Sequence, residues 1–211
     1  MQYRPCQILL FVFCLILVSP QPAKASDAKS CVLEIGEAIE QADTDRFTQL
    51  VDVDGVLGHV LDAFLQWAKK PDIAKEMPPM LAIALMQAEQ NASAGKMIRS
   101  LLLTESRAFL LDGIASGAFA GKKKPHTAQG ILAPLFANAS LGRKEITHVG
   151  EAEDLEGGWL VPFSVRDWDN GQVYPINGFV ERVQGECQLT NILNVQELFE
   201  RIEEEARSLE E

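Results

Sequence analysis

The sequence predicts an α+β fold: N-terminal helices packed on a curved antiparallel sheet of three or four strands, followed by a C-terminal helix. Helical periodicities fill the chain from about residue 26 to residue 141. Two linked hairpins occupy residues 159–193, and one amphipathic helix follows them. Because helices and strands segregate along the chain instead of alternating, the pattern favours α+β over α/β. We expect a single domain over residues 26–211, with its sheet and last helix at about 146–211.

Residues 1–25 have the pattern of a secretory signal peptide. Arg4 gives a positive start, the apolar run 8–18 is too short for a comfortable membrane span, and Ala23-Lys24-Ala25 has the small-x-small pattern of a cleavage site. We therefore expect cleavage near Ala25 and a periplasmic or secreted mature chain without stable membrane insertion. An uncleaved membrane anchor is the alternative.

The mature chain is strongly acidic. Once Arg4 and Lys24 leave with the signal peptide, 17 Lys and Arg remain against 30 Asp and Glu, a net charge of −13. Such a chain is a poor partner for nucleic acid or for anionic lipid surfaces. We therefore expect no nucleic-acid partner, and the one basic run, Lys122–Lys124, is typical of a solvated loop.

The helical half divides at Asp- and Pro-rich breaks. Asp43 and Asp52 are suited to begin helices as N-caps, and the pair Pro78-Pro79 suits the start of another. The expected helices cover about 29–42, a brief turn around Phe47, 53–67, 80–92, 96–111 and, more weakly, 127–139. The segment 113–121 is rich in Gly, Ala and Ser, which fits either a tightly packed helix end or a mobile loop.

Asn170-Gly171 is the clearest turn signal of the sheet. Asn-Gly suits a type I′ turn, which would place Trp168 opposite Val173 and Phe163 opposite Gly178. Gly178 would then leave room for the aromatic ring. With this pairing one face of the hairpin is apolar, and its members are Trp159, Val161, Phe163, Val165, Tyr174, Ile176 and Val180. A second turn is expected at 184–186, a third strand at 187–193 and a fourth at about 146–151.

Cysteine usage agrees with export. Cys6 and Cys14 lie in the signal peptide, which leaves Cys31 and Cys187 as an even pair in an oxidising compartment. We predict a disulfide between them, with two separate buried thiols as the alternative. No CxxC or HxxxH spacing occurs, so we expect no metal site and no cofactor.

The last helix begins at Asn194, with Glu197 three residues on as a capping-box partner. Its outer face is acidic, and a docking role in assembly or inhibition is one possible use of that face.

His59 is the one histidine with a candidate chemical partner, since Asp62 lies three residues on along a predicted helix. Such a pair in a pocket could perform general acid–base work, but a surface or satisfied core histidine is the plainer interpretation. His126 falls in a loop and His148 on a predicted strand. No catalytic motif of the kind G-x-S-x-G, and no phosphate-binding loop, occurs in the sequence.

Two stretches carry a resemblance to a known family. Residues 38–47, with Asp43 and Phe47, are followed by Val51-Asp52, and the chain closes on Gly185-Glu186-Cys187-Gln188-Leu189-Thr190-Asn191-Ile192. These stretches resemble the opening helices and the last strand of NTF2-like (cystatin-like α+β) domains and of DUF2939-type exported bacterial proteins. Cys187 stands where that strand pattern has Trp, and residues 72–141 would be an insertion.

The resemblance implies a conical domain whose curved sheet and helices enclose an apolar pocket, although fold alone does not assign its use. We expect an exported, non-enzymatic module that binds a small apolar or lipid-like ligand or an envelope protein. The alternative is a metal-independent NTF2-like pocket enzyme, an isomerase, dehydratase or hydrolase. The predicted ligand-binding residues are Trp159, Phe163, Val165, Tyr174 and Ile176.

Overall fold

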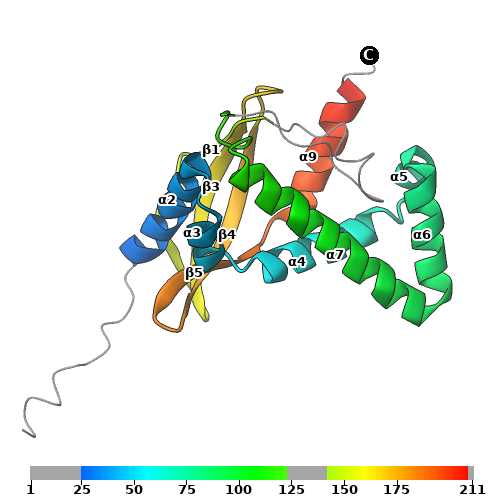
Figure 1. The fold of residues 1–211 in the computed structure, drawn as a ribbon, viewed down its shortest axis with the longest axis horizontal. Coiled ribbons are helices and arrows are strands. Elements are labelled where there is room, and N and C mark those ends of the chain that lie inside the picture. Colours follow the sequence, from blue (N-terminus) through cyan, green and yellow to red (C-terminus); the bar gives the residue numbers. More distant parts are fainter. Residues whose placement is uncertain (1–24, 123–141, 209–211) are drawn as a thin grey trace, which may run out of the picture.

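The computed structural model describes residues 25–122 and 142–208. Residues 1–24 of the predicted signal peptide (1–25) and the predicted helix at 127–139 therefore lie outside the described residues. Within them the chain forms seven helices and one curled, antiparallel sheet (Figure 1). This arrangement confirms the α+β class and the C-terminal helix.

The first three helices lie close to their predicted positions, although the first begins at Ala25 instead of about residue 29. They are α2 (Ala25–Gln41), α3 (Thr44–Leu50) and α4 (Val53–Trp67). The Asp43 carboxylate accepts a hydrogen bond from the Arg46 N–H at 2.9 Å, and that of Asp52 accepts one from Gly55 at 3.0 Å. Each aspartate thereby satisfies a backbone N–H that the first turn of a helix leaves without a partner.

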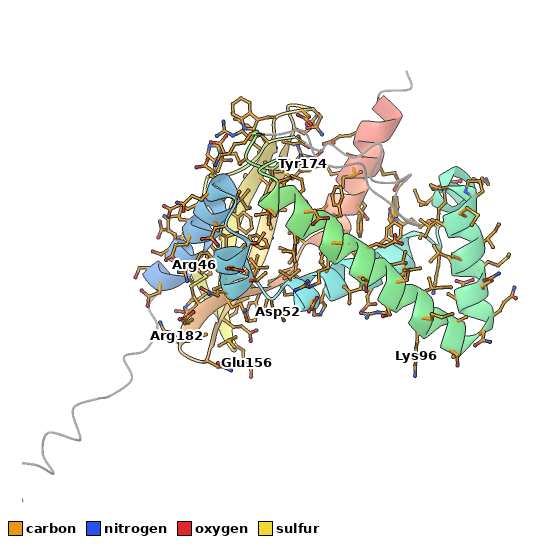
Figure 2. All side chains as sticks on the ribbon, in the orientation of Figure 1. Arg46, Asp52, Lys96, Glu156, Tyr174 and Arg182 are labelled. Atoms are coloured by element: carbon orange, nitrogen blue, oxygen red, sulfur yellow. A yellow bond between two sulfur atoms is a disulfide. The ribbon has the colours of Figure 1, made fainter. Side chains whose placement is uncertain are left out.

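Three further helices extend away from the sheet. They are α5 (Pro71–Glu76), α6 (Pro79–Gln90) and α7 (Ala92–Ala115). We call residues 61–103, which include α5, α6 and the adjoining parts of α4 and α7, the helical arm. Figure 2 shows Lys96 at the tip of this arm and Arg182 at the opposite end of the molecule. Leu81 of α6 and Leu102 of α7 are both fully buried and hold the arm together as a small core of its own.

The helix α7 is longer than the predicted 96–111. It begins early because the Asn91 side chain accepts hydrogen bonds from the N–H groups of Ser93 and Ala94. Ile114 in its last turn and Ala118 just beyond it are fully buried, and the Phe119 N–H donates to the Gly113 carbonyl at 3.1 Å. Of the two possibilities for residues 113–121, the structure therefore shows the packed helix end.

The sheet has five strands: four lie in the order β1-β3-β4-β5, and the short β2 pairs with the other end of β3. The strands are β1 (Lys144–Thr147), β2 (Glu153–Leu155), β3 (Gly158–Asp167), β4 (Val173–Val183) and β5 (Glu186–Ile192). The predicted strand at 146–151 corresponds only in part to β1, and β2 was not predicted.

The predicted register between β3 and β4 is wrong by two residues. Phe163 lies opposite Ile176, not opposite Gly178. The Asp167 N–H donates to the Gln172 carbonyl at 2.9 Å, and the Asn170 side chain accepts from the Gln172 N–H. These bonds close a longer loop in which Gly171 has a positive φ of +73° but Asn170 does not. Consecutive positive φ angles, as in a type I′ turn, occur instead at Gln184-Gly185 (+53° and +95°).

A shift of two residues leaves each side chain on its predicted face. Val161 and Val180 are fully buried and Phe163 is 7% exposed, all packed against α2. A Cβ on Gly178 would lie 2.9 Å from Phe163 Cε1 and 2.8 Å from Leu189 Cδ1. Gly178 therefore does leave room for the ring, although the ring approaches it diagonally.

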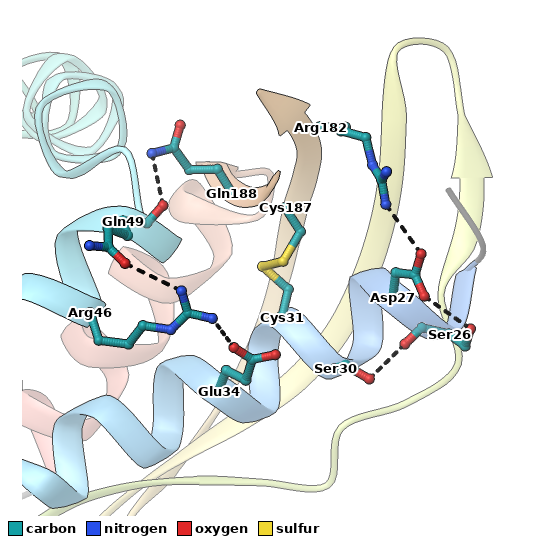
Figure 3. The surroundings of a disulfide bond; sticks show 10 residues. All are labelled: Ser26, Asp27, Ser30, Cys31, Glu34, Arg46, Gln49, Arg182, Cys187 and Gln188. Atoms are coloured by element: carbon teal, nitrogen blue, oxygen red, sulfur yellow. Dashed lines mark hydrogen bonds and ion pairs between the residues drawn. A yellow bond between two sulfur atoms is a disulfide. The ribbon is translucent and has the colours of Figure 1, made fainter. Parts of the chain in front are cut away.

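The structure confirms the disulfide between Cys31 of α2 and Cys187 of β5, whose Cα atoms are 6.0 Å apart (Figure 3). Nearby, Arg182 of β4 pairs with Asp27 at 3.2 Å, and Arg46 of α3 pairs with Glu34 of α2. The covalent bond thus lies within a set of polar contacts that join the first helices to each other and to the sheet.

The last helix, α9 (Val195–Ser208), follows β5 directly. Asn194 does not act through the predicted capping box. Its side-chain oxygen instead accepts from the Asn177 N–H, and its amide donates to the Pro175 carbonyl, both at 2.9 Å. These bonds fix the start of α9 against β4. Phe199 then packs on α4, 5.5 Å from Trp67 between ring centroids.

Candidate functional site

The five residues predicted to bind a ligand share one face of β3 and β4, and all but Tyr174 take part in the core that α2 helps to form. Phe163 belongs to the core, while Trp159, Val165 and Ile176 are partly buried and pack against the same core residues. Side chains of α2 and α3 complete this cluster. The face that the sequence predicted as a site is therefore built as a wall of the main core.

Tyr174 is half-buried and linked to α9. Its hydroxyl donates to Glu205 at 2.9 Å and accepts from the Asn170 amide at 3.0 Å. The Arg201 guanidinium lies 5.8 Å from the ring centroid. Burial raises the pKa of Tyr174, and the neighbouring Glu205 carboxylate acts in the same direction. These contacts give the side chain a clear structural role between the hairpin and the last helix.

The His59–Asp62 pair has a different arrangement from the predicted dyad. His59 is exposed on α4, and its Nδ1 lies 3.3 Å from the Gly55 carbonyl. Both carboxylate oxygens of Asp62 receive hydrogen bonds from Arg99 of α7, at 2.7 and 2.9 Å. These bonds lower the pKa of Asp62. The aspartate therefore serves to join α4 to α7.

Of the other two histidines, the structure describes only His148. His148 is exposed beyond β1 with a φ of +51°, and its Nδ1 lies 3.2 Å from the Thr147 hydroxyl. His126 lies outside the described residues.

A groove opens in the helical arm, between α4, α6 and α7, with a volume of about 480 Å³. This value falls within the roughly 300–1,000 Å³ that is usual for small-molecule sites. Most of its lining is aliphatic or thioether, and this apolar part comprises Leu65, Ala68, Met77, Ala82, Leu85, Met86 and Ala88. A concave, mainly apolar surface with a few polar groups is the usual form of a ligand site.

Local sequence explains why the groove stays open. Pro78 and Pro79 start α6 in a new direction after α5. At the tip of the arm, a Cβ on Gly95 would lie only 3.0 Å from the Ala88 carbonyl oxygen, so α6 and α7 meet closely there. Leu81 and Leu102 hold the two helices together farther along. The groove lies beside this contact, on the side that faces α4.

Charged groups lie at the groove's edge. Lys69 Nζ is 3.8 Å from Glu89 Oε1, and the side chains of both residues are more than half exposed. Arg99 also lines the groove, held by its pair with Asp62. The groove therefore combines an apolar lining with a polar rim.

Sequence reasoning missed this site, although the methionines gave a signal. The chain has five methionines, and all but Met1 lie in the arm, at positions 77, 80, 86 and 97. Met77 and Met86 line the groove, whereas Met80 and Met97 are 66% and 69% exposed. Methionine side chains are flexible and polarizable, and they are common on surfaces that accept varied apolar partners.

The acidic face of α9 is present as predicted from the pattern. Glu197, Glu200 and Glu204 lie around a shallow hollow together with Gln172 of the hairpin loop. Its use as a docking surface stays a prediction.

Among residues 25–122 and 142–208, no group of three or more His, Cys, Asp or Glu side chains is placed to hold a metal ion. Over the same residues, no helix has both the length and the apolar character needed to cross a membrane.

Comparison with protein-family models, with curated proteins and with solved structures returns no match. The resemblance to NTF2-like domains therefore stays a prediction.

Proposed function

We propose that this chain is an exported, non-enzymatic binding module that holds a small apolar or lipid-like ligand in the groove between α4, α6 and α7. The groove is the observation that carries the proposal. Its volume and its lining suit a ligand that buries aliphatic surface, and burial of each CH₂ group contributes about 0.8 kcal/mol.

Export is supported by the pattern of residues 1–25 and by the pairing of Cys31 with Cys187. Disulfides persist in oxidising compartments, and a cytosolic protein of this kind seldom keeps one. We therefore place the mature chain, beginning near Ser26, in the periplasm or outside the cell. Intact mass of the exported protein tests the cleavage position.

The non-enzymatic part rests on the described histidines and on the groove's composition. His59 and His148 are both exposed and lie away from the groove lining. The groove's own charged residues engage one another or nearby helices in ion pairs. This composition favours binding over acid–base chemistry.

The proposal is tested by extracting the protein after export to a bacterial periplasm and identifying bound molecules by mass spectrometry. Ala82→Trp fills the groove, whereas Ile83→Trp adds the same ring one residue on, where Ile83 is 47% exposed and outside the lining. We expect the wild-type protein and Ile83→Trp to carry an apolar ligand and Ala82→Trp to lose it.

Met86→Lys provides a second test if tryptophan at position 82 disturbs folding. Met86 is 53% exposed, so a lysine there is tolerated while it places a charge at the groove. Equal ligand content in the wild-type, Ala82→Trp and Met86→Lys proteins would contradict the proposal, as would a wild-type protein that carries none.

A further inference from the structure

The charged residues around the groove are not equivalent. Arg99 is fixed, since its Nε and one terminal nitrogen bind the two oxygens of Asp62 and the same terminal nitrogen reaches the Gly58 carbonyl at 3.4 Å. Lys69 is held far more loosely. Its ammonium is 3.8 Å from Glu89, near the limit of an ion pair, and the side chains are 53% and 59% exposed. An exposed ion pair of this kind contributes little to the free energy of folding. Lys69 can therefore exchange Glu89 for another anion at a small cost in free energy.

Lys69 is also well placed to contact the head of a ligand. It follows the last turn of α4 and lines the groove beside Ala68, whose side chain is buried. A lysine commonly lays its aliphatic stem along apolar surface and keeps its ammonium in water. A ligand with its apolar chain in the groove therefore meets a positive group at the exposed edge.

The charge of the surroundings favours an anion at this edge. The groove is lined by two cationic residues, Lys69 and Arg99, and by one acidic residue, Glu89. Lys70 follows directly, whereas Lys75, in the last turn of α5, pairs with Asp72 at 3.7 Å. In a mature chain of net charge −13, most of the surface repels anions. The end of α4, where Lys69 and Lys70 are adjacent, is a local exception.

The groove's size limits the ligand. A volume of about 480 Å³ lies in the lower half of the usual range for small-molecule sites. It suits one aliphatic chain better than the paired chains of a membrane phospholipid.

From these observations we propose that the groove selects single-chain amphiphiles with an anionic head group, and that the Lys69 ammonium binds that head. This inference rests on the proposed function of the same groove. It adds the class of ligand and names Lys69 as the residue that binds the head group.

Three probes with a dodecyl-length chain and different heads test the inference by isothermal titration calorimetry: laurate, 1-dodecanol and dodecyltrimethylammonium. In wild-type protein at neutral pH and low salt, we expect laurate to bind up to about fivefold more tightly than dodecanol, the range of one exposed ion pair. The cationic probe should bind most weakly. Added salt should reduce the preference for laurate, because exposed charges are screened.

Lys69→Gln should remove the preference for laurate while binding of dodecanol persists. Lys70→Gln is the matched control, since it removes the same charge one residue on, from a side chain outside the groove lining. It should keep most of the preference. Ala82→Trp should abolish binding of all three probes.

The outcomes separate this inference from the proposed function. Equal binding of laurate and dodecanol by the wild-type protein overturns the head-group inference and leaves the groove as a site. An equal loss of the preference for laurate in Lys69→Gln and Lys70→Gln also overturns it, because the overall positive charge of this region would then explain the preference. Tighter binding of the cationic probe would assign the head contact to Glu89 instead. Failure of every probe to bind overturns both proposals.

Discussion

Loss of the Cys31–Cys187 disulfide should show how strongly the first helix is held to the sheet. The two residues are 156 positions apart, so the bond closes most of the mature chain into one loop. In the chain-entropy model, a loop of this length stabilises the folded state by about 5 kcal/mol. Engineered and native disulfides often deliver somewhat less, so we expect a loss of about 3–5 kcal/mol in the free energy of unfolding.

The structure also indicates which replacement is mildest. Cys31 is fully buried between α2 and the sheet, whereas Cys187 is only partly buried on the edge strand β5. Alanine at both positions removes the bond without placing a hydroxyl in the core. Total stability of a domain is typically about 5–15 kcal/mol, so the variant should be markedly less stable but folded at low temperature.

Urea denaturation, followed by circular dichroism, measures the effect in oxidised wild-type protein, reduced wild-type protein and the Cys31→Ala/Cys187→Ala variant. The reduced wild type and the variant should both unfold at lower urea than the oxidised protein. Reductant should leave the variant unchanged, which serves as the control. If oxidation makes no difference to the unfolding midpoint of the wild type, the disulfide does not stabilise the folded state.

Three further predictions concern the sheet and α9. Gly178→Ala should lower the free energy of unfolding by about 1–3 kcal/mol, because the new methyl meets the buried Phe163 and Leu189 side chains; thermal denaturation without a shift would contradict this. Asn194→Ala should lower the free energy of unfolding by about 1–3 kcal/mol, since it leaves the Asn177 N–H and the Pro175 carbonyl without this partner. In the same thermal denaturation, Asn194→Asp, which keeps the acceptor, should lower it less. Tyr174 is the one tyrosine besides Tyr3, so tyrosinate absorbance of the mature chain should report it alone, rising above the ordinary pKa of about 10. Because the pKa of Tyr174 is higher in the folded state than in the unfolded state, the stability that Tyr174 contributes is complete below about pH 10. It is lost as the pH rises through the folded pKa, and Tyr174→Phe should abolish this loss. Titration of Tyr174 at the ordinary pKa would refute this prediction.

Local patterns predicted most of the elements because their causes are local. The stripe from Val53 to Trp67 matches α4 at both ends, since Asp52 caps its start and Pro71 stops its continuation. The apolar alternation of β3 and β4 also predicted the buried face correctly. These features depend on residues that are neighbours in sequence.

Long-range features were harder to predict. The register of the first hairpin depends on how the backbone of 167–172 bonds across its loop, and the Asn-Gly pair alone did not determine that. The candidate site depends on the angles at which α6 and α7 pack beside α4. The periodicity of each helix showed that it has an apolar side, but not which part of that side a neighbour leaves open.

The methionine methyl groups give the most direct test of the groove as the ligand site. Met77 and Met86 line it, while Met80 and Met97 lie exposed elsewhere on the arm. In protein labelled at the methionine methyl carbons and assigned with Met→Leu variants, added laurate should shift the NMR signals of Met77 and Met86 and leave those of Met80 and Met97 in place. Shifts confined to Met80 and Met97, or no shift at saturating laurate, would contradict the assignment of the groove.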